Sequence, residues 1–284
     1  MGIALGGGGL KGLAHIGILQ IITDNNIPIS LLSGTSAGSI IAALYAVGIS
    51  PYSMENIVLK IKKEDYIDYN ISSLLKYIAS LFFPGINTTL DGLIQGKRLE
   101  KLLYKLTRGK YLSEVKIPLA ITSCDINTGR EVIFTNQNIE VESENTVIIK
   151  EALLSTAVRA SISIPATFTP LPFQGMQLVD GGIRDMVPVS IQKTMGAEYI
   201  LAINLGQARY TNPVAGIPGI ISRTLNILTY ETSDAEEGMF ADLVINPDLE
   251  EVRLDELDRA GEIIRAGRRV MQAGIYKLKK GLNI

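Results

Sequence analysis

The sequence predicts an α/β protein of three layers (α/β/α), in which helices cover both faces of a mainly parallel central sheet and a helical insertion occupies about residues 52–109. Three observations predict this fold class. Short apolar runs typical of strands alternate with longer runs that carry apolar residues at helical spacing. The chain of 284 residues is 46% hydrophobic, enough for a large core. No internal repeat interrupts the alternation, so we expect a single domain over residues 1–284.

Two strand–helix units follow one another within the first fifty residues. Residues 2–5 and 29–33 are short apolar segments that predict strands. Residues 10–26 and 37–47 predict helices. Because both helices follow strands directly, the two strands are expected to run parallel.

The strand pattern stops after the second helix. Ser50-Pro51 predicts an N-cap followed by the first residue of a new helix. From there to about residue 109 the sequence is helical in character, and residues 96–107 form its clearest amphipathic piece. We interpret this stretch as an insertion into the α/β pattern.

Strands return in the second half of the chain. Residues 119–125 and 131–135 predict a hairpin, since Asn127-Thr128-Gly129 is a turn sequence. Further elements are predicted as a helix at 146–160, strands at 177–179, 199–205 and 243–245, and a closing helix at 254–280.

Charge and hydropathy exclude several function classes. The net charge of −2 and a pI near 5.6 give no basic footprint, so nucleic acid is not expected as a partner. Mean hydropathy is +0.24, yet no stretch approaches 18 consecutive apolar residues, which argues against a spanning helix. No targeting segment is visible, so a cytoplasmic location is expected. The sequence leaves the oligomeric state open.

A glycine loop joins the first strand to the first helix, reading Gly6-Gly7-Gly8-Gly9-Leu10-Lys11-Gly12. Such a loop turns tightly and presents several N–H groups to an anion or a developing oxyanion. It contains a G-x-G-x-x-G pattern, so a dinucleotide-binding module is an alternative. However, the second strand ends Leu32-Ser33-Gly34 without an acidic residue for a ribose, and no Ser or Thr follows Lys11 to make a P-loop.

Gly34-Thr35-Ser36-Ala37-Gly38 follows the second strand and opens the second helix. This is the G-x-S-x-G pattern of a nucleophile elbow, in which small flanking residues permit a strained turn that exposes the serine hydroxyl. The alternative interpretation of Ser36 is an ordinary helix N-cap.

The chain has one histidine and one cysteine, His15 and Cys124. These exclude an internal disulfide and nearly exclude a zinc site, and we expect neither a metal nor a cofactor. A Ser–His–Asp triad of the hydrolase order needs a histidine after the serine, and none follows His15. We therefore interpret His15 as a packed helix residue and expect a carboxylate base.

Several motifs occur in a characteristic order: Gly7 to Gly12, His15-Ile16-Gly17, Gly34 to Gly38, Arg159-Ala160-Ser161 with Ile164-Pro165, and Asp180-Gly181-Gly182. Together they resemble the patatin-like phospholipase family, in its bacterial type, over roughly residues 2–205. The resemblance implies a Ser–Asp dyad with Ser36 as nucleophile and Asp180 as base. It also implies an oxyanion hole from Gly7, Gly8 and Gly9, and hydrolysis of acyl esters in phospholipids or related lipids, as a phospholipase A or lysophospholipase does.

Physical chemistry sets a condition on this dyad. A free aspartate has a pKa of about 3.9 and is a feeble base toward a hydroxyl, so the site must strengthen it by desolvation and contact with the serine. Val179 before Asp180 and the two glycines after it fit a strand that delivers the carboxylate to a turn. The alternative is an Asp that bonds its own turn backbone. A catalytically silent lipid-binding relative is a further alternative for the whole chain.

Weaker candidates have simpler interpretations. Asp125 and Asp185 are expected to be caps or surface turn formers, and Cys124 a small buried hydrophobe. Lys11 either attracts a lipid phosphate or orients the loop.

Two segments bear on membrane contact. Residues 66–83 are apolar at helical spacing with few charges, which fits a lid or interfacial helix over an acyl groove, but also a core helix or dimer face. Residues 253–284 hold a local net charge of +4, which fits anionic headgroups or a solvated helix face.

Overall fold

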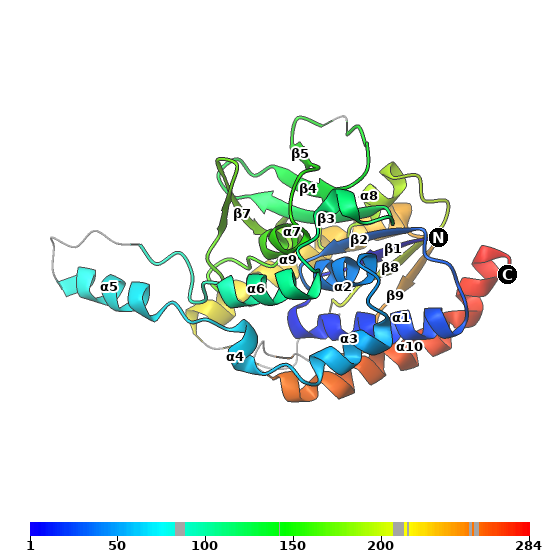
Figure 1. The fold of residues 1–284 in the computed structure, drawn as a ribbon, viewed down its shortest axis with the longest axis horizontal. Helices are drawn as coiled ribbons and strands as arrows, with labels where there is room; N and C mark the ends of the chain where they lie inside the picture. The colour runs from blue at the N-terminus through cyan, green and yellow to red at the C-terminus, as the bar shows by residue number, and fades with distance from the viewer. Residues whose placement is uncertain (83–88, 142, 207–212, 215, 250–251, 253–255) are drawn as a thin grey trace.

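A mainly parallel sheet forms the middle layer of the protein, as predicted (Figure 1). The computed structural model describes residues 1–82, 89–141, 143–206, 213–214, 216–249, 252 and 256–284. The strand order is β5-β4-β3-β2-β1-β8-β9, with β7 beside β3 and β6 beside β7. The strands are β1 (Gly2–Leu5), β2 (Leu31–Thr35), β3 (Leu119–Asp125), β4 (Glu131–Thr135), β5 (Thr146–Ile149), β6 (Leu171–Phe173), β7 (Met176–Asp180), β8 (Ile200–Ile203) and β9 (Leu243–Ile245).

The centre of the sheet is parallel and one side of it is mixed. β1 pairs in parallel with both β2 and β8, and β2 pairs in parallel with β3. β3 and β4 form the predicted antiparallel hairpin, and β7 also pairs antiparallel with β3. Gly129 in the hairpin turn has φ +73°, a conformation that glycine adopts readily, which explains the turn signal in the sequence.

Alternation along β1 shows how the two faces of the sheet are covered. Ile3 and Leu5 belong to the main core with α1, α2, α7 and α10, whereas Ala4 packs in a second cluster with residues of α8 and α9. The predicted three-layer α/β/α arrangement is therefore confirmed. The helices of these layers are α1 (Ala14–Asp24), α2 (Ala37–Ala46), α7 (Leu154–Ser161), α8 (Val189–Thr194), α9 (Ile217–Phe240) and α10 (Ala260–Leu282).

Two glycines let α1 and α10 approach closely. A Cβ at Gly17 would meet the carbonyl oxygen of Ile264, and a Cβ at Gly267 would meet that of Ala14. Within the closing segment, 260–282 is helical, close to the predicted 254–280, while residues 254–255 of the prediction lie outside the described residues. The closing helix is thus a structural layer over α1.

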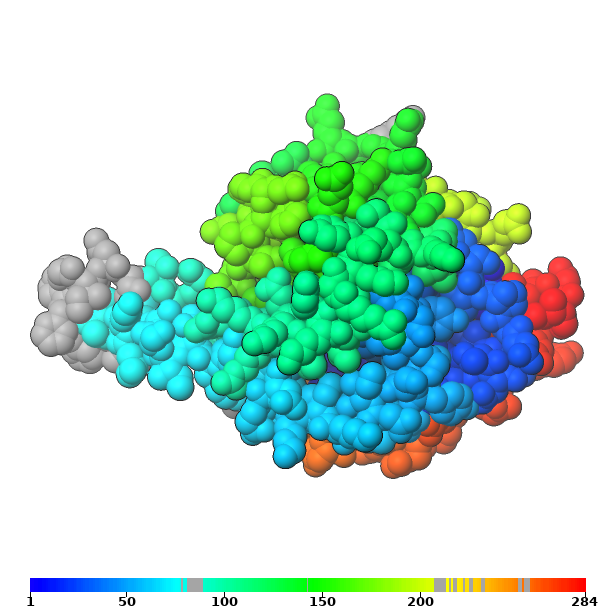
Figure 2. Space-filling view, viewed as in Figure 1, coloured from blue at the N-terminus to red at the C-terminus, as the bar shows by residue number. Residues whose placement is uncertain are grey.

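The insertion consists of helices, as predicted, and the Ser50 hydroxyl caps the first by accepting from the Ser53 N–H at 3.2 Å. Its helices are α3 (Pro51–Val58), α4 (Lys63–Tyr66), α5 (Ile71–Phe82) and α6 (Lys97–Leu106). α6 lies against the core through Leu103, but α5 projects from the body of the molecule (Figures 1 and 2). Ile71 and Leu75 on α5 are 60% and 61% exposed, so the interpretation of this segment as a core helix is wrong for these described residues.

One predicted helix is partly wrong. The segment 146–160 begins with β5, which pairs in parallel with β4, and only then enters α7. Its first residues, Thr146-Val147-Ile148-Ile149, are β-branched and favour a strand beside a hydrophobic neighbour. The elements β6, α8 and α9 were not predicted. Short 3-10 helices complete the described fold: η1 (Gly9–Leu13), η2 (Leu112–Glu114), η3 (Gly181–Ile183) and η4 (Leu257–Arg259).

No helix in the ranges given above combines the length and the apolar character needed to cross a bilayer.

Candidate active site

The strand β3 brings the ends of β2 and β7 together. β2 runs parallel to β3 and its last residue, Thr35, pairs with Thr122. β7 runs antiparallel to β3 and its last residue, Asp180, pairs with Ser123. Consecutive Cα atoms are about 3.8 Å apart. The two strands therefore approach the same point of β3 from opposite directions, and Ser36 and Asp180 meet there.

Ser36 occupies a strained strand-to-helix turn. Its φ is +50° and its ψ −122°, a conformation that L-residues rarely adopt. Ser36 is the N-cap residue of α2 and directly precedes its first turn. Flanking glycines make the turn possible, since a Cβ at Gly34 would meet the backbone of Gly38, and a Cβ at Gly38 would meet the Leu5 carbonyl. The residue is only 5% exposed. The local geometry is that of the elbow predicted from the sequence.

The two oxygens of the Asp180 carboxylate differ in their hydrogen bonding. Oδ1 accepts the Gly182 N–H at 2.8 Å, which is the turn bond of the alternative interpretation. Oδ2 is buried without a hydrogen-bond donor among the described residues. Burial raises the pKa of Asp180 to about 6, although the Ser36 hydroxyl and the Gly182 N–H lower it. The desolvation that strengthens an aspartate as a base is therefore present.

The glycine loop lies next to Ser36. The Gly6 and Gly7 N–H groups donate to Ile203 and Met186 carbonyls, each at 3.0 Å, so these donors are already engaged. Gly8 and Gly9 have φ +154° and +58°, and their N–H groups donate to no other described residue. Of the three glycines predicted for the oxyanion hole, two hold free N–H donors.

Two close contacts hold the loop against the elbow. A Cβ at Gly12 would meet the Ala37 side chain, and a Cβ at Gly7 would lie 3.1 Å from the Ser36 Cβ. A Cβ at Gly181 and one at Gly182 would meet Thr122 and the Met186 side chain. The glycines named in the motifs thus serve the close approach of three backbone segments.

His15 lies behind the glycine loop and is fully buried. Burial lowers its pKa to about 4, while the hydrogen bond with Gly6 raises it. The ring is therefore neutral at pH 7, and Nε2–H donates to the Gly6 carbonyl oxygen at 2.8 Å. This geometry fits the packed helix residue expected from the sequence.

The structure agrees with the expectations for some of the weaker candidate residues and not for others. Asp125 caps its turn, accepting from the Thr128 hydroxyl at 2.6 Å and from two backbone N–H groups. Cys124 is buried, as expected. The expectation of a surface position for Asp185 is wrong, because the residue is only 7% exposed, and burial raises its pKa well above the usual value. Lys11 donates to the Leu205 carbonyl oxygen at 2.9 Å, which ties the loop to the segment that follows β8.

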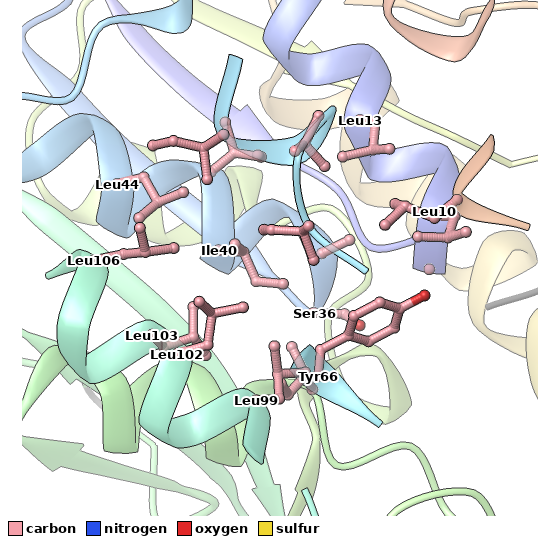
Figure 3. A pocket seen from close by; sticks show the side chains of 18 of the residues that line it. Leu10, Leu13, Ser36, Ile40, Leu44, Tyr66, Leu99, Leu102, Leu103 and Leu106 are labelled. Atoms are coloured by element: carbon pink, nitrogen blue, oxygen red, sulfur yellow. The ribbon is translucent and has the colours of Figure 1, made fainter. Parts of the chain in front are cut away.

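An apolar pocket opens at Ser36 (Figure 3). Its empty volume is about 1040 Å³, open solvent at its mouth included. Apolar side chains of α2, α3 and α6 supply 11 of the 24 lining residues, and none of the described lining residues is charged. Along α2, Ile40 and Leu44 lie one and two turns beyond Ser36, so the pocket extends for roughly 12 Å along that helix. The insertion therefore builds the far wall of a cavity that begins at the nucleophile.

Three contacts at the site escaped the sequence analysis. The Ser36 N–H donates to the Ser161 hydroxyl at 2.8 Å, and Arg159 is a buried side chain that bonds backbone carbonyls. The Tyr230 hydroxyl, from the unpredicted α9, donates to the Gly7 carbonyl oxygen at 3.0 Å. Arg159 and Ser161 belong to one of the motifs quoted from the sequence, but the motif does not show which atoms these side chains contact in the fold. Within the described ranges, no cluster of His, Cys, Asp and Glu could hold a metal ion.

The sheet, the strained turn at Ser36 and the glycine loop define an α/β protein in which a serine occupies a sharp turn between a parallel strand and a helix. The patatin-like phospholipase family model matches residues 3–191, and the chain belongs to this family.

Named relatives agree with the family. The chain is 28% identical over 214 residues to lysophospholipase NTE1 of Scheffersomyces stipitis, covering 75% of this chain and 12% of that protein. It is 26% identical over 212 residues to patatin-like phospholipase domain-containing protein 6 of Mus musculus, covering 74% and 14%. The chain thus spans only about an eighth of the length of these relatives. A crystal structure of ExoU with SpcU from Pseudomonas aeruginosa is similar at a TM-score of 0.49 and 16% identity, covering 98% of this chain and 52% of that one.

Proposed function

We propose that this protein is a serine acyl hydrolase that cleaves acyl ester bonds of phospholipids or related lipids, as a phospholipase A or lysophospholipase does. The observation that carries the proposal is the placement of a strained Ser36 beside the buried carboxyl of Asp180, at the opening of an apolar pocket. The names of the relatives support the same class of substrate.

In the first half of the reaction, Ser36 Oγ attacks the ester carbonyl carbon and its proton passes to Asp180. The C=O π pair moves onto the carbonyl oxygen. The tetrahedral species then collapses, the ester C–O bond breaks, and protonated Asp180 donates to the leaving alkoxide. In the second half, water attacks the carbonyl carbon of the acyl-serine while Asp180 accepts its proton. The bond between that carbon and Ser36 Oγ then breaks, Asp180 returns the proton to Oγ, and the fatty acid leaves.

The negative oxygen of the tetrahedral species needs donors that are already oriented. Gly9 lines the same pocket as Ser36, Gly8 directly precedes it in the loop, and α2 begins at Ala37, the residue after Ser36. The Gly7 N–H would join only if its bond to Met186 were exchanged. We therefore assign the oxyanion hole to Gly8 and Gly9 first, with the positive end of α2 adding to it.

The apolar pocket suits an acyl chain. A chain that enters at Ser36 would pass Ile40 and end against Leu44 and Leu106, which Figure 3 shows on the side away from the nucleophile. Each buried CH₂ group would contribute about 0.8 kcal/mol. A dinucleotide has no comparable use for an uncharged aliphatic lining, which disfavours that alternative.

The experiment compares wild type with Ser36→Ala on a short acyl ester, on a lysophospholipid and in labelling by a fluorophosphonate. We expect turnover and labelling in the wild type, and loss of both in Ser36→Ala by at least about a thousandfold. A silent lipid-binding relative would bind lipid without labelling. Unchanged turnover in Ser36→Ala would contradict the assignment.

We also propose that α5 contacts a lipid surface while the pocket receives its substrate. The chain leading to α5 passes through Tyr66 and Ile67, which line the pocket, so α5 follows the pocket wall directly in the sequence. Helix α5 (Ile71–Phe82) holds one Lys and no acid, and it exposes Ile71 and Leu75. Burial of such side chains at a bilayer is favourable, whereas their exposure to water is not. A cytoplasmic location remains a prediction from the sequence.

The test of this contact is co-sedimentation with vesicles of ether-linked phosphatidylcholine, which has no acyl ester to hydrolyse. Ile71→Asp places a charge at the first residue of α5, where helices tolerate acids, and we expect about tenfold weaker binding. Ile126→Asp, at an exposed isoleucine in the turn after β3, is the control and should bind as wild type does. Equal binding of both variants, or a wild-type dimer that Ile71→Asp dissociates, would contradict the proposal.

A further inference from the structure

The last turn of α7 and the residues after it contact both members of the dyad. The Ser161 hydroxyl oxygen accepts the Ser36 N–H at 2.8 Å. Two residues further on, the Ser163 carbonyl oxygen accepts the Asp180 N–H at 2.9 Å. Both serines are completely buried, so water does not compete for these bonds. A single short segment therefore holds the nucleophile and the base by their backbone amides.

The bond to Ser36 matters because of the strain at that residue. Ser36 has a positive φ, which costs free energy unless its surroundings hold it in place. Its N–H does not bond within α2, since Ser36 is the N-cap of that helix. Ser161 supplies the missing acceptor from a separate helix. Without it, the N–H would be buried and unpaired, and the turn could relax.

Arg159 connects the same segment to the wall of the pocket. Its guanidinium bonds the Ser163 hydroxyl and donates to the carbonyl oxygens of Gln95 and Thr169 at 2.6 and 2.8 Å. Gln95 is followed by Gly96, the N-cap residue of α6. Gly96 has φ +77°, and a Cβ at this position would meet the Arg159 guanidinium. The guanidinium also lies 5.5 Å from the ring centroid of Phe168, a pocket residue. Arg159 thus ties the insertion to the segment that holds the dyad.

We propose that the segment from Arg159 to Ser163 is a positioning element of the active site, in which Ser161 fixes the nucleophile, the Ser163 backbone fixes the base, and Arg159 couples both to the pocket wall. The inference rests on the proposed function, since it assigns roles relative to Ser36 and Asp180. Neither Arg159 nor Ser161 touches the reacting atoms in this assignment.

The first variant is Ser161→Ala, which deletes the acceptor and little volume. We expect kcat and the rate of fluorophosphonate labelling to fall together by about ten- to a hundredfold, since small misplacements of a nucleophile are costly. KM for a long-chain ester should stay unchanged, because Ser161 does not line the pocket. Ser155→Ala is the matched control, as Ser155 is equally buried in the same helix. It should keep both constants.

The second variant is Arg159→Lys, which keeps the charge but cannot hold Ser163, Gln95 and Thr169 together. We expect a lower kcat together with a higher KM for long-chain esters only, since the wall around α6 loosens as well. If Arg159→Lys does not fold, Ser163→Ala removes the hydroxyl that contacts the guanidinium and leaves the carbonyl in place. It should lower kcat by about three- to tenfold.

The outcomes separate the two proposals. If Ser161→Ala and Arg159→Lys, or Ser163→Ala in its place, hydrolyse esters as fast as the wild type while Ser36→Ala is inactive, the positioning element is wrong and the proposed function stands. A fall in thermal midpoint with unchanged kcat and KM in the folded variants likewise overturns it. If the wild type itself is neither labelled nor active, the proposed function has failed.

Discussion

The end of the sheet around Ser36 and the helical insertion contribute to the same cavity in different ways. At the sheet end, polar groups are fixed by backbone register, glycine contacts and short hydrogen bonds. The insertion contributes aliphatic side chains and is held to the core by Arg159 and by packing of Leu103. The comparison teaches that backbone topology places the reacting groups, whereas a separate helical wall shapes what reaches them.

The strongest way to break this comparison is Asp180→Asn. The amide keeps an oxygen for the Gly182 N–H but cannot accept the proton of Ser36, so we expect turnover to fall by about 10³-fold or more. Asp185→Asn is the matched control, because Asp185 is also buried, five residues on, with a raised pKa, and its carboxyl has no part in the dyad. It should retain activity. Equal losses in the two variants would mean that burial of a carboxyl, rather than its place beside Ser36, determines activity.

The pH dependence of the wild type is the next test. Since the base must be ionised, kcat/KM should rise with pH through about 6, the pKa to which burial raises Asp180. The stability effect has the opposite sign. The raised pKa stabilises the fold fully below pH 3.8, and this contribution of about 3 kcal/mol is lost as pH rises through about 6. Asp180→Asn should therefore raise the thermal midpoint at pH 8. An activity midpoint near pH 4 would show that the carboxyl is hydrated in solution.

The insertion should determine chain length instead of chemistry. Leu106→Phe fills the end of the pocket away from Ser36, and we expect kcat/KM for a long-chain ester to fall by about tenfold while an acetyl ester is unaffected. Leu59→Phe lies in the same insertion, is exposed and does not line the pocket, so it serves as the control. Equal effects on both esters would show that the wall also positions the dyad.

His15→Ala should have the smallest effect on chemistry. The variant loses the bond to Gly6 and buries less volume, so we expect about 2–4 kcal/mol of lost stability and an unchanged acid limb in the pH profile. In the wild type, the lowered pKa of His15 stabilises the fold above pH 6.5, and this is lost as pH falls toward about 4. Urea unfolding at pH 5 and 8 measures this change in the free energy of unfolding. Abolished turnover in a folded His15→Ala protein would give the histidine a direct role.

The sequence analysis was correct where a position in the fold accepts only one kind of residue. Glycines at the loop and elbow are needed by close backbone approach, so their spacing was informative about Ser36. The prediction of a helix at residues 146–149 was wrong. These β-branched residues form a strand because they pair with β4, a contact that the local pattern does not reveal. Helix α9 was not predicted, and neither was the contact of its Tyr230 with the glycine loop. Burial of Asp185 could not be predicted, since it depends on how separate elements pack around the loop after β7.

The meeting of β2 and β7 on β3 also has a kinetic consequence. The nucleophile and the base lie far apart in the chain. β2 and β7 come together only because each of them pairs with β3. Contacts of such long sequence separation form late, because the intervening chain must first close a loop. During refolding from urea, ester hydrolysis should therefore return with the slowest phase of the reaction, after helical signal has recovered. Lipolytic capacity would then report completion of the sheet, and incompletely folded chains would be harmless to surrounding lipid.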